Sequence, residues 1–304
     1  MSIGDGYHGT HGVLDIHTRL TGCQQLPLSC PEEELSDGDL ICLETPVNPT
    51  GLALDISFYA EKAHRRGAYL MVDSTFGPPP LQDPFAMGAD IVMHSGTKYI
   101  GGHSDMLCGV IATKNKEWIS RLAEDRVFLG SVLGSLEGFL GLRSIRTLQL
   151  RVQRQSQNAT FLVDALEGSL ADHPNKPVLD DEDKNNIKAV VTEIKHASLQ
   201  HQDKSWLSKQ MSGGYGPVFA LLMRTENFAK RLPSKLNLFA HATSLGGVES
   251  LVEWRTMSDP TTPRNLLRFS IGIEHAEDLL KDLVQGFKAV REEEQHSAAK
   301  IQSL

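Results

Sequence analysis

The 304-residue sequence predicts an α/β fold, with a mostly parallel sheet covered by helices and a smaller C-terminal α+β domain. A helical stretch at 56–65 begins after Asp55, a good N-cap residue, and ends at Gly67. Such stretches alternate with short apolar runs, and this alternation favours parallel pairing of the strands between them. The runs are continuous, as expected of strands buried on both faces, and they lie at 40–45, 68–73, 89–94 and 107–112.

The second half of the chain predicts the smaller domain. A long helical pattern at 133–166 leads out of the first domain. The polar segment 172–186, which contains the acidic run 180–183, is expected to be a solvated loop. Later patterns predict strands at 216–223 and 266–271 and a helix at 276–291. We therefore expect a large domain at 1–150, a small domain at 151–292 and a frayed tail at 293–304.

Composition and charge exclude several classes of protein. The 30 Lys and Arg against 38 Asp and Glu, without a long basic run, argue against a protein that binds nucleic acid through phosphate contacts. No run approaches the roughly 20 apolar residues that span a bilayer, and the start lacks the pattern of a secretory signal. The cysteines form no Cys-x-x-Cys pair, so we expect reduced thiols in a cytoplasmic protein; they are Cys23, Cys30, Cys42 and Cys108.

The densest group of chemically active side chains lies at 94–105, with the sequence HSGTKYIGGHSD, directly after a predicted strand. Lys98 stands there among hydroxyl side chains and glycines, 25 residues after Asp73, which ends the preceding predicted strand. The carboxyl ends of parallel strands meet at one edge of a sheet, so Lys98 and Asp73 can face one cavity. A lysine nucleophile beside a phosphate-binding turn suits a covalent link to pyridoxal phosphate.

Other interpretations of this segment compete with that one. A P-loop needs Gly-Lys followed by Ser or Thr, whereas Lys98 is followed by Tyr99. A metal site made of His94, His103 and Cys108 lacks a recognised ligand spacing. A lysine in a glycine-rich surface turn is the remaining alternative. An NAD-dependent dehydrogenase would need a Gly-x-Gly-x-x-Gly turn after an early strand, which the sequence lacks.

Four motifs, in sequence order, resemble those of the trans-sulfuration (Cys/Met metabolism) pyridoxal-phosphate enzymes. This family includes cystathionine γ-synthase, γ-lyase and β-lyase, and O-acetylhomoserine sulfhydrylase. The resemblance extends from Tyr7 to about Phe287 and implies the aspartate-aminotransferase-like fold of pyridoxal-phosphate enzymes. It also implies a homo-oligomer, a tetramer built from tight dimers with active sites at the dimer interface. The motifs are ETPVNPT at 44–50, VDSTF at 72–76, HSGTKYIGGHSD at 94–105 and SLGGVESL at 244–251.

The resemblance implies a role for each matched residue. Lys98 would bind the cofactor covalently and then act as the catalytic base. Asp73 would pair with the pyridine nitrogen, and Arg268 would bind the α-carboxylate of the substrate. Ser95 and Thr97 would bind the phosphate, and Thr75 would make further contacts to the cofactor. Asn48 would contact both the ring and the substrate, and Tyr7 would stack on the ring and transfer a proton during catalysis. Ser244 would order the substrate pocket.

The sequence departs from the family pattern at several places. Family members carry a further N-terminal segment with phosphate-binding residues, so the resemblance implies an N-terminally truncated large domain with weaker cofactor binding. Thr243 stands where members that handle cystathionine usually carry Glu, and Gly12 stands where the family often has arginine. The segment 256–265 is shorter than usual, which would reshape the mouth of the substrate pocket.

The resemblance implies γ-replacement on an activated homoserine by a thiol, as in cystathionine γ-synthase. Cystathionine γ-lyase-type elimination and O-acetylhomoserine sulfhydrylase activity are the alternatives within the family. A non-catalytic truncated paralogue is the alternative from another class. We expect a small amino-acid substrate and a thiol as partners, and neither metal, nucleic acid nor membrane.

Overall fold

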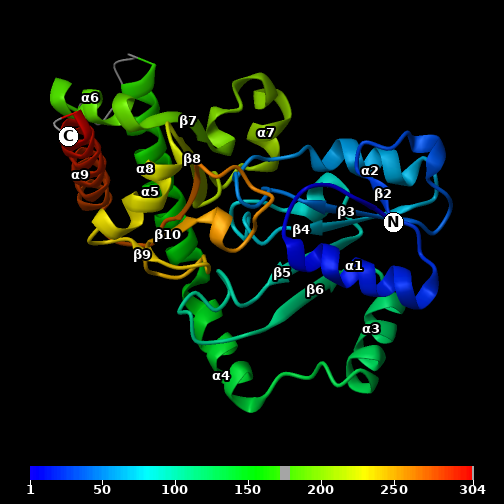
Figure 1. Cartoon of the computed structure of the whole chain (residues 1–304). Helices are drawn as coiled ribbons and strands as arrows, with labels where there is room; N and C mark the ends of the chain where they lie inside the picture. Colours follow the sequence, from blue (N-terminus) through cyan, green and yellow to red (C-terminus); the bar gives the residue numbers. More distant parts are fainter. Residues whose placement is uncertain (172–178, 303–304) are drawn as a thin grey trace.

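Two sheets organise the chain, which is a computed structural model that describes residues 1–171 and 179–302, with side chains to Ser297. In this described part, the first sheet has the strand order β2-β1-β3-β4-β5-β6 and the second has the order β7-β8-β11-β10-β9. The helix α5 (Leu148–Leu170) runs beside the second sheet and links the two halves of the molecule (Figure 1).

The strands are short, and most hold five residues or fewer. Those of the first sheet are β1 (Ser2–Ile3), β2 (Leu26–Pro27), β3 (Leu40–Glu44), β4 (Tyr69–Asp73), β5 (Ile91–Ser95) and β6 (Gly109–Thr113). Those of the second sheet are β7 (Val191–Lys195), β8 (Val218–Met223), β9 (Ala240–His241), β10 (Leu251–Trp254) and β11 (Leu266–Ser270).

Helices cover both sheets. Apart from α5, the α-helices are α1 (His8–Thr21), α2 (Ile56–His64), α3 (Lys116–Phe128), α4 (Ser135–Ser144), α6 (Asp181–Val190), α7 (Lys204–Gln210), α8 (Glu226–Arg231) and α9 (Ala276–Gln302). Within the described ranges, none of them is both long enough and apolar enough to cross a membrane.

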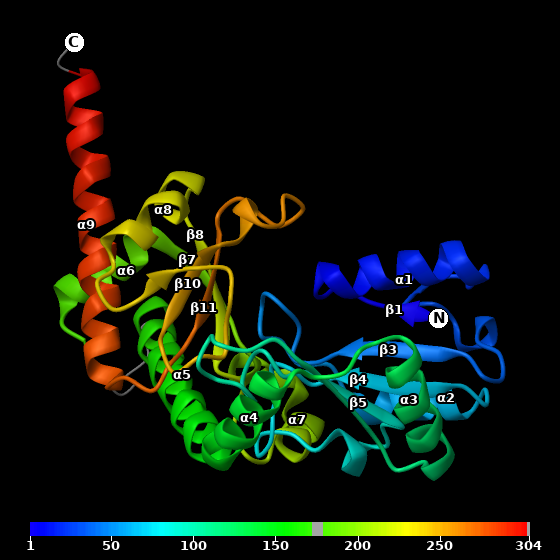
Figure 2. The ribbon, with the colours of Figure 1, turned by 90° about the horizontal axis from the view of Figure 1, so that it is seen from below.

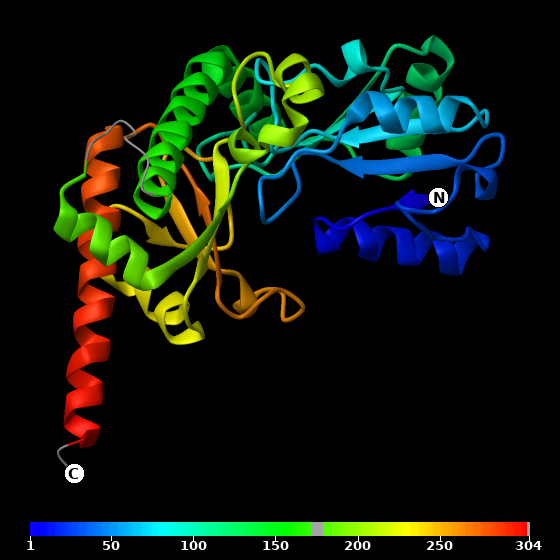
Figure 3. The same ribbon diagram turned by 90° about the horizontal axis from the view of Figure 1, so that it is seen from above.

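The first sheet brings three strand ends to one edge. The strands β1 to β5 pair in parallel, and only β6 runs antiparallel to its neighbour, so the predicted mostly parallel sheet is confirmed. Glu44 lies opposite Asp73 in the register of β3 and β4. The apolar face of α2, with Ile56 and Ala60, packs on one side of this sheet, while α1 lies on the other side (Figure 3). The N-cap predicted at Asp55 is confirmed, because its side chain accepts a hydrogen bond from the Phe58 N–H.

The second sheet is mostly antiparallel and holds the larger apolar core. Phe219 on β8 stacks on Phe269 on β11 with ring centroids 5.2 Å apart, and both side chains are fully buried. α5, α6 and α9 pack together beside this sheet (Figure 2). This buried apolar surface stabilises the positions of β10 and β11, whose side chains Val252, Leu267 and Phe269 belong to it.

The predicted single helix at 133–166 is wrong in its continuity. The structure places α4 at Ser135–Ser144, a 3₁₀ turn at Ile145–Thr147, and then α5. The Thr147 hydroxyl donates to the Ser144 carbonyl oxygen, and the Arg151 guanidinium donates to the same oxygen at 3.0 Å. These side-chain hydrogen bonds compete with the helical backbone pattern and end α4 there.

The expectations for the acidic segment and for the tail are also wrong. Residues 172–178 of the expected loop lie outside the described residues, but α6 starts at Asp181. Asp180 caps that helix, because its side chain accepts a hydrogen bond of 2.8 Å from the Asp183 N–H. The acidic residues of the first turn also interact favourably with the positive end of the helix dipole. The predicted tail at 293–304 is helical up to Gln302. Side-chain contacts support its start, since Glu294 accepts a hydrogen bond from Asn227 at 2.6 Å.

Candidate active site

Residues from both sheets line one cavity of about 560 Å³. The carboxyl ends of β3, β4 and β5 contribute one wall, and β11 with the turns before and after β10 contributes the other. All nine predicted site residues lie in this lining: Tyr7, Asn48, Asp73, Thr75, Ser95, Thr97, Lys98, Ser244 and Arg268. Residues from positions 7 to 268 thus meet at the edge where parallel sheets commonly place their sites.

Asp73 is a carboxylate that the chain itself only partly satisfies. Thr75 donates its N–H and its hydroxyl to Asp73 Oδ1, at 3.0 and 2.6 Å. Within the described ranges, no other residue donates a hydrogen bond to this carboxylate. Burial raises the pKa of Asp73, and the two hydrogen bonds from Thr75 oppose that rise. A cationic N–H group in the cavity would therefore stabilise the ionised form.

Lys98 lies in the turn after β5 and lines the same cavity. Burial lowers its pKa, and the nearby Arg268 cation lowers it further, so the neutral amine is favoured relative to an exposed lysine. The turn that holds Ser244 packs directly on the Lys98 backbone. Gly246 has φ +81° there, and a Cβ at this position would lie 3.0 Å from the carbonyl carbon of Lys98. Glycine is required by both the close approach and the left-handed backbone.

Arg268 points from β11 to the Asn48 side of the cavity. Its Nη1 donates to Asn48 Oδ1 at 3.1 Å, and its Nη2 donates to the carbonyl oxygen of Ser244 at 3.0 Å. Nη2 also forms an ion pair of 2.6 Å with Glu253, its neighbour across the β10–β11 ladder. Burial lowers the pKa of Arg268 to about 10. A rigid guanidinium in this position suits the binding of a carboxylate.

The predicted phosphate-binding hydroxyls lie where β5 meets β6. Thr97 Oγ1 accepts the Cys108 N–H at 3.1 Å, which fixes the turn that follows β5. The backbone N–H of Ser95 donates to Thr75 Oγ1 at 2.8 Å, so the same threonine that contacts Asp73 also orients Ser95. These contacts order the hydroxyl-rich turn at the cavity wall.

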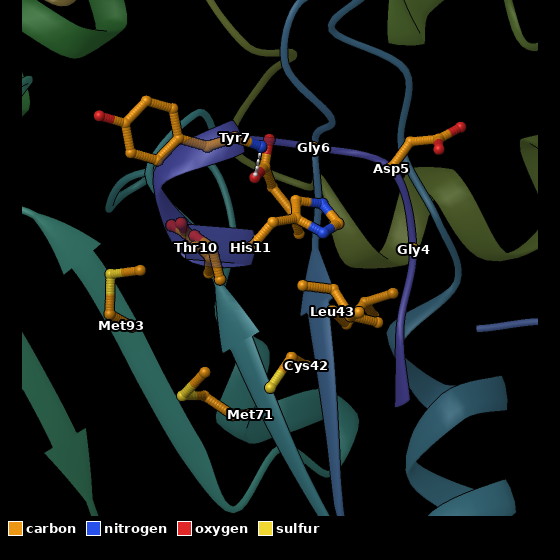
Figure 4. Close-up of a pocket in the computed structure, with 13 residues that line it drawn as sticks. Gly4, Asp5, Gly6, Tyr7, Thr10, His11, Cys42, Leu43, Met71 and Met93 are labelled. Carbon is orange, nitrogen blue, oxygen red and sulfur yellow. Dashed lines mark hydrogen bonds between the residues drawn. The ribbon is translucent and has the colours of Figure 1, made fainter. Parts of the chain in front are cut away.

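Glu44 is a site residue that the sequence interpretation missed, although it stands at a strand end in a quoted motif. Its carboxylate accepts the Tyr7 N–H and the Asn48 N–H, each at 2.7 Å, and so joins two predicted site residues. Figure 4 shows Gly6 and Tyr7 above the strand ends, with the hydrogen bond from the Tyr7 N–H to Glu44 drawn as a dashed line. The residues drawn there line a small pocket of about 20 Å³. Burial and the neighbouring Asp73 charge raise the pKa of Glu44 to about 8.

Glu253 and Arg255 are two further charged residues that the sequence interpretation missed. Both are buried, and Arg255 lines the cavity. Only the alternation of side chains along β10 hints that Glu253 shares a sheet face with Arg268. The competing metal site is not formed, because no cluster of three or more His, Cys, Asp or Glu in the described part of the chain is placed to bind a metal ion.

Comparisons with known proteins show the family to which the chain belongs. The sequence profile of the Cys/Met metabolism PLP-dependent enzymes matches residues 30–288. Cystathionine γ-synthase of Mycobacterium tuberculosis (strain ATCC 25618 / H37Rv) is 39% identical over 300 residues, which cover 92% of this chain and 71% of that protein. The chain belongs to this family. Its cofactor is therefore pyridoxal 5′-phosphate.

Other members carry other activity names. Cystathionine β-lyase of Lactococcus lactis subsp. cremoris (strain MG1363) is 34% identical, and the match covers 82% of this chain and 63% of that protein. The crystal structure of apo CalE6, a methionine γ-lyase from Micromonospora echinospora, superposes with a TM-score of 0.81 at 33% identity, covering 94% of this chain and 75% of that one. The fold is thus that of a pyridoxal-phosphate lyase or synthase, and the names span more than one reaction.

The donor set of the cavity fits pyridoxal phosphate. Lys98 offers an amine of lowered pKa, and Asp73 offers a half-buried carboxylate whose Oδ2 has no donor in the described part of the chain. The turn with Ser95 and Thr97 offers hydroxyl groups on the same lining. The cavity therefore offers an amine for an aldehyde, a carboxylate for a pyridinium nitrogen and hydroxyl groups for a phosphate.

Proposed function

We propose that this chain catalyses γ-replacement, in which a thiol displaces the γ-substituent of an activated homoserine, as in cystathionine γ-synthase. The observation that carries the proposal is the meeting of Lys98, Asp73 and Arg268 in one cavity. The relatives that match over most of this chain support the reaction class, and the γ-synthase of M. tuberculosis is among them.

The bound cofactor supplies an electron-accepting ring that is conjugated with the substrate amine. Asp73 would pair with the ring nitrogen and hold the proton there, because a nearby carboxylate favours the protonated form of its partner. Lys98 would take the proton from Cα, and its lowered pKa favours the neutral amine relative to an exposed lysine. Arg268 holds the α-carboxylate, and Asn48 orients that arginine through their 3.1 Å hydrogen bond.

Tyr7 lines the cavity directly before α1, and 48% of its surface is exposed. We assign to its hydroxyl the delivery of a proton to the leaving γ-substituent. Ser95 and Thr97 would bind the phosphate, with Thr75 orienting both Asp73 and Ser95. Ser244 orders the pocket through its carbonyl oxygen, which accepts from Arg268.

The proposal is tested with the purified chain loaded with pyridoxal phosphate. O-succinyl- or O-acetyl-L-homoserine is supplied with cysteine, and cystathionine is measured by mass spectrometry. We expect cystathionine from the unaltered chain and none from Lys98→Ala, because that variant lacks the base. Borohydride reduction followed by peptide mapping should place the cofactor on Lys98. Lys281→Ala, a substitution of an exposed lysine on α9, is the matched control.

The same assay separates the alternative activities. Release of 2-oxobutanoate without cystathionine would indicate γ-elimination, and replacement by sulfide but not by cysteine would indicate a sulfhydrylase. A chain that stays colourless with added cofactor and forms no product would be a non-catalytic paralogue, which would contradict the proposed function.

A further inference from the structure

A buried arginine of α5 contacts the turn that carries Lys98. Arg151 is 6% exposed, and its Nη1 donates a hydrogen bond of 2.8 Å to the carbonyl oxygen of Tyr99, the residue after Lys98. Its Nη2 donates a longer hydrogen bond, of 3.4 Å, to the carbonyl oxygen of Ile100. In the part of the chain that the structure describes, no other group donates to either oxygen. The guanidinium therefore binds the backbone directly after the proposed base.

The turn leaves space for this guanidinium only because it contains a glycine. The Gly102 N–H donates to the carbonyl oxygen of Lys98 at 2.7 Å, which closes a helical turn around the lysine. Gly102 has φ +69°, and a Cβ at this position would lie 2.0 Å from Arg151 Nη1. The Gly102 carbonyl oxygen accepts the Val248 N–H at 3.0 Å, so the turn is also tied to the second domain. The backbone of Lys98 is thus fixed by contacts with two different elements.

The rest of the guanidinium binds the junction between α4 and α5. Its Nη2 donates to the carbonyl oxygen of Ser144, the last residue of α4, at 3.0 Å, and its Nε donates to the hydroxyl of Thr147 at 3.1 Å. Arg151 itself lies in the first turn of α5, whose later residues belong to the apolar core of the second domain. The side chain therefore connects the Lys98 turn to a helix that the core holds in place.

Stability alone does not account for a cation at this position. The acceptors of Arg151 in the described part of the chain are three carbonyl oxygens and one hydroxyl, and none of them is a carboxylate. Burial lowers the pKa of Arg151, because the charged form loses its hydration. An apolar side chain of similar volume often stabilises a buried site as well as a charged one does. Such a side chain would lack the donors that hold the Lys98 turn.

We propose that Arg151 is a positioning residue, which holds the Lys98 turn so that the lysine amine stays in the active-site cavity at the place where it acts as the base. The inference rests on the proposed function of Lys98 and adds the residue that fixes its backbone. Arg151 is not among the described residues that line the cavity, so it acts through Lys98 and not on the substrate.

The first test measures Lys98 in the cofactor-free protein. Reductive methylation with formaldehyde and a borane, followed by peptide mass spectrometry over a range of pH, gives the pKa of this amine. In the unaltered chain burial and the Arg268 cation lower that pKa, and Glu253, which forms ion pairs with both Arg268 and Arg255, opposes them.

Arg151→Met keeps an unbranched apolar side chain but removes the donors. The freed turn should expose the Lys98 amine to water, so its pKa should rise toward the ordinary value of 10.5. Arg154→Met, a substitution of an exposed arginine on the same helix, is the matched control and should leave the pKa unchanged.

The second test measures turnover by the cofactor-loaded protein. In Arg151→Met kcat should fall about 10- to 100-fold, because a displacement of the base by about 1 Å has an effect of this size. KM for the homoserine ester should change less than about threefold, since Arg268 and Asn48 still bind the α-carboxylate. Arg151→Lys, which restores a cationic donor without the planar fork, should recover part of kcat.

The inference is overturned if Arg151→Met folds and either the pKa of Lys98 or kcat stays at its value in the unaltered chain, because Arg151 would then only stabilise the fold. Equal changes in Arg154→Met, or a rise in KM at constant kcat, would also overturn it. Arg151→Gln, which keeps neutral donors, replaces the Met variant if that one does not fold, and the same two changes are expected of it. If the Lys98 pKa rises while the unaltered chain forms no product, the proposed reaction fails and the positioning role stands.

Discussion

Single residues of the cavity show how burial sets the chemistry. Asp73 and Glu44 lie opposite each other at adjacent strand ends, and burial raises the pKa of both carboxyl groups. They differ in their partners among the described residues, since Glu44 accepts two backbone N–H groups whereas Asp73 accepts only from Thr75, through Oδ1. Glu44 therefore organises the chain around the site, and Asp73 keeps an oxygen available for the contact with the ring nitrogen that we propose.

The role of Asp73 predicts a large effect of removing its charge. Asp73→Ala should lower the pKa of the ring nitrogen by about one to three units, and kcat should fall by about 10- to 1,000-fold. Steady-state kinetics with O-succinylhomoserine and cysteine measure this effect, and Asp73→Glu, which keeps the charge, should recover part of the rate. A near-normal kcat for Asp73→Ala would exclude the proposed pairing with the ring nitrogen.

Glu44 predicts a pH dependence of stability in the cofactor-free protein. The pKa of Glu44 in the folded protein, about 8, lies above the ordinary value of 4.5. Its contribution to the free energy of unfolding is therefore fully present below pH 4.5 and is lost as the pH rises through 8. Burial lowers the pKa of both His94 and His196 to about 4, so these histidines change the free energy of unfolding only below pH 6.5. Between pH 6.5 and 8.5, the free energy of unfolding in urea should fall by at most about 1.4 kcal/mol per pH unit relative to Glu44→Gln. If the free energy of unfolding changed with pH in the same way in both proteins, the raised pKa of Glu44 would be refuted.

At the scale of elements, side-chain hydrogen bonds decide where the helices begin and end. α6 occupies part of a segment whose polarity predicts a loop, because Asp180 caps it and because Ile187 and Val190 are fully buried in the apolar core of the second domain. The 3₁₀ turn between α4 and α5 likewise depends on Thr147 and Arg151, which bind the Ser144 carbonyl oxygen. Amphipathic pattern alone does not show either feature.

The cap of α6 predicts a measurable loss of stability. Asp180→Ala removes the acceptor for the Asp183 N–H and should lower the free energy of unfolding by about 1 kcal/mol. Chemical denaturation followed by circular dichroism measures this change. Asp181→Ala is the matched control, since that side chain is fully exposed and should change stability by only a few tenths of a kcal/mol. Equal losses in both variants would show that charge, and not capping, stabilises the start of α6.

At the scale of the whole molecule, ten large apolar side chains of one stretch of the chain are exposed among the described residues. They lie on α4 and on the chain on either side of it (Figure 1). Leu107, which lines the active-site cavity, is 78% exposed and adds a further uncovered apolar side chain at the site. A patch of this extent on a folded chain marks an interface. The patch consists of Val127, Phe128, Leu129, Val132, Leu133, Leu136, Phe139, Leu142, Ile145 and Leu150.

We propose that a second copy of the chain covers this patch, as the homo-oligomer implied by the family resemblance requires. Light scattering after size exclusion should show a dimer or a larger assembly. The double variant Phe139→Asp, Leu142→Asp should be monomeric, because each substitution places a charge in the apolar interface. Phe58→Asp, at an exposed apolar position on α2, should keep the assembly. A monomeric unaltered chain at micromolar concentration would contradict the proposal.

Much of the fold and of the site follows from local pattern. The runs that end at Glu44, Asp73 and Ser95 are apolar enough to require burial on both faces, so their parallel pairing and common edge are predictable. Lys98 and Asp73 could therefore be placed in one site from their positions after strands. Residues as remote as Tyr7 and Arg268 could be assigned only through the family motifs, because no local pattern relates them.

By itself, the sequence determined the α/β class, the strand edge that carries Lys98 and Asp73, and the family to which those motifs belong, because each depends on short-range periodicity or on residue types in fixed order. Only the tertiary structure decided the breaks and caps around α4, α5 and α6, the link that Glu44 makes between Tyr7 and Asn48, and the arginine pair around Glu253. These depend on burial and on side-chain contacts that strand pairing and packing bring about, such as the one between Tyr7 and Glu44, and a linear pattern contains neither.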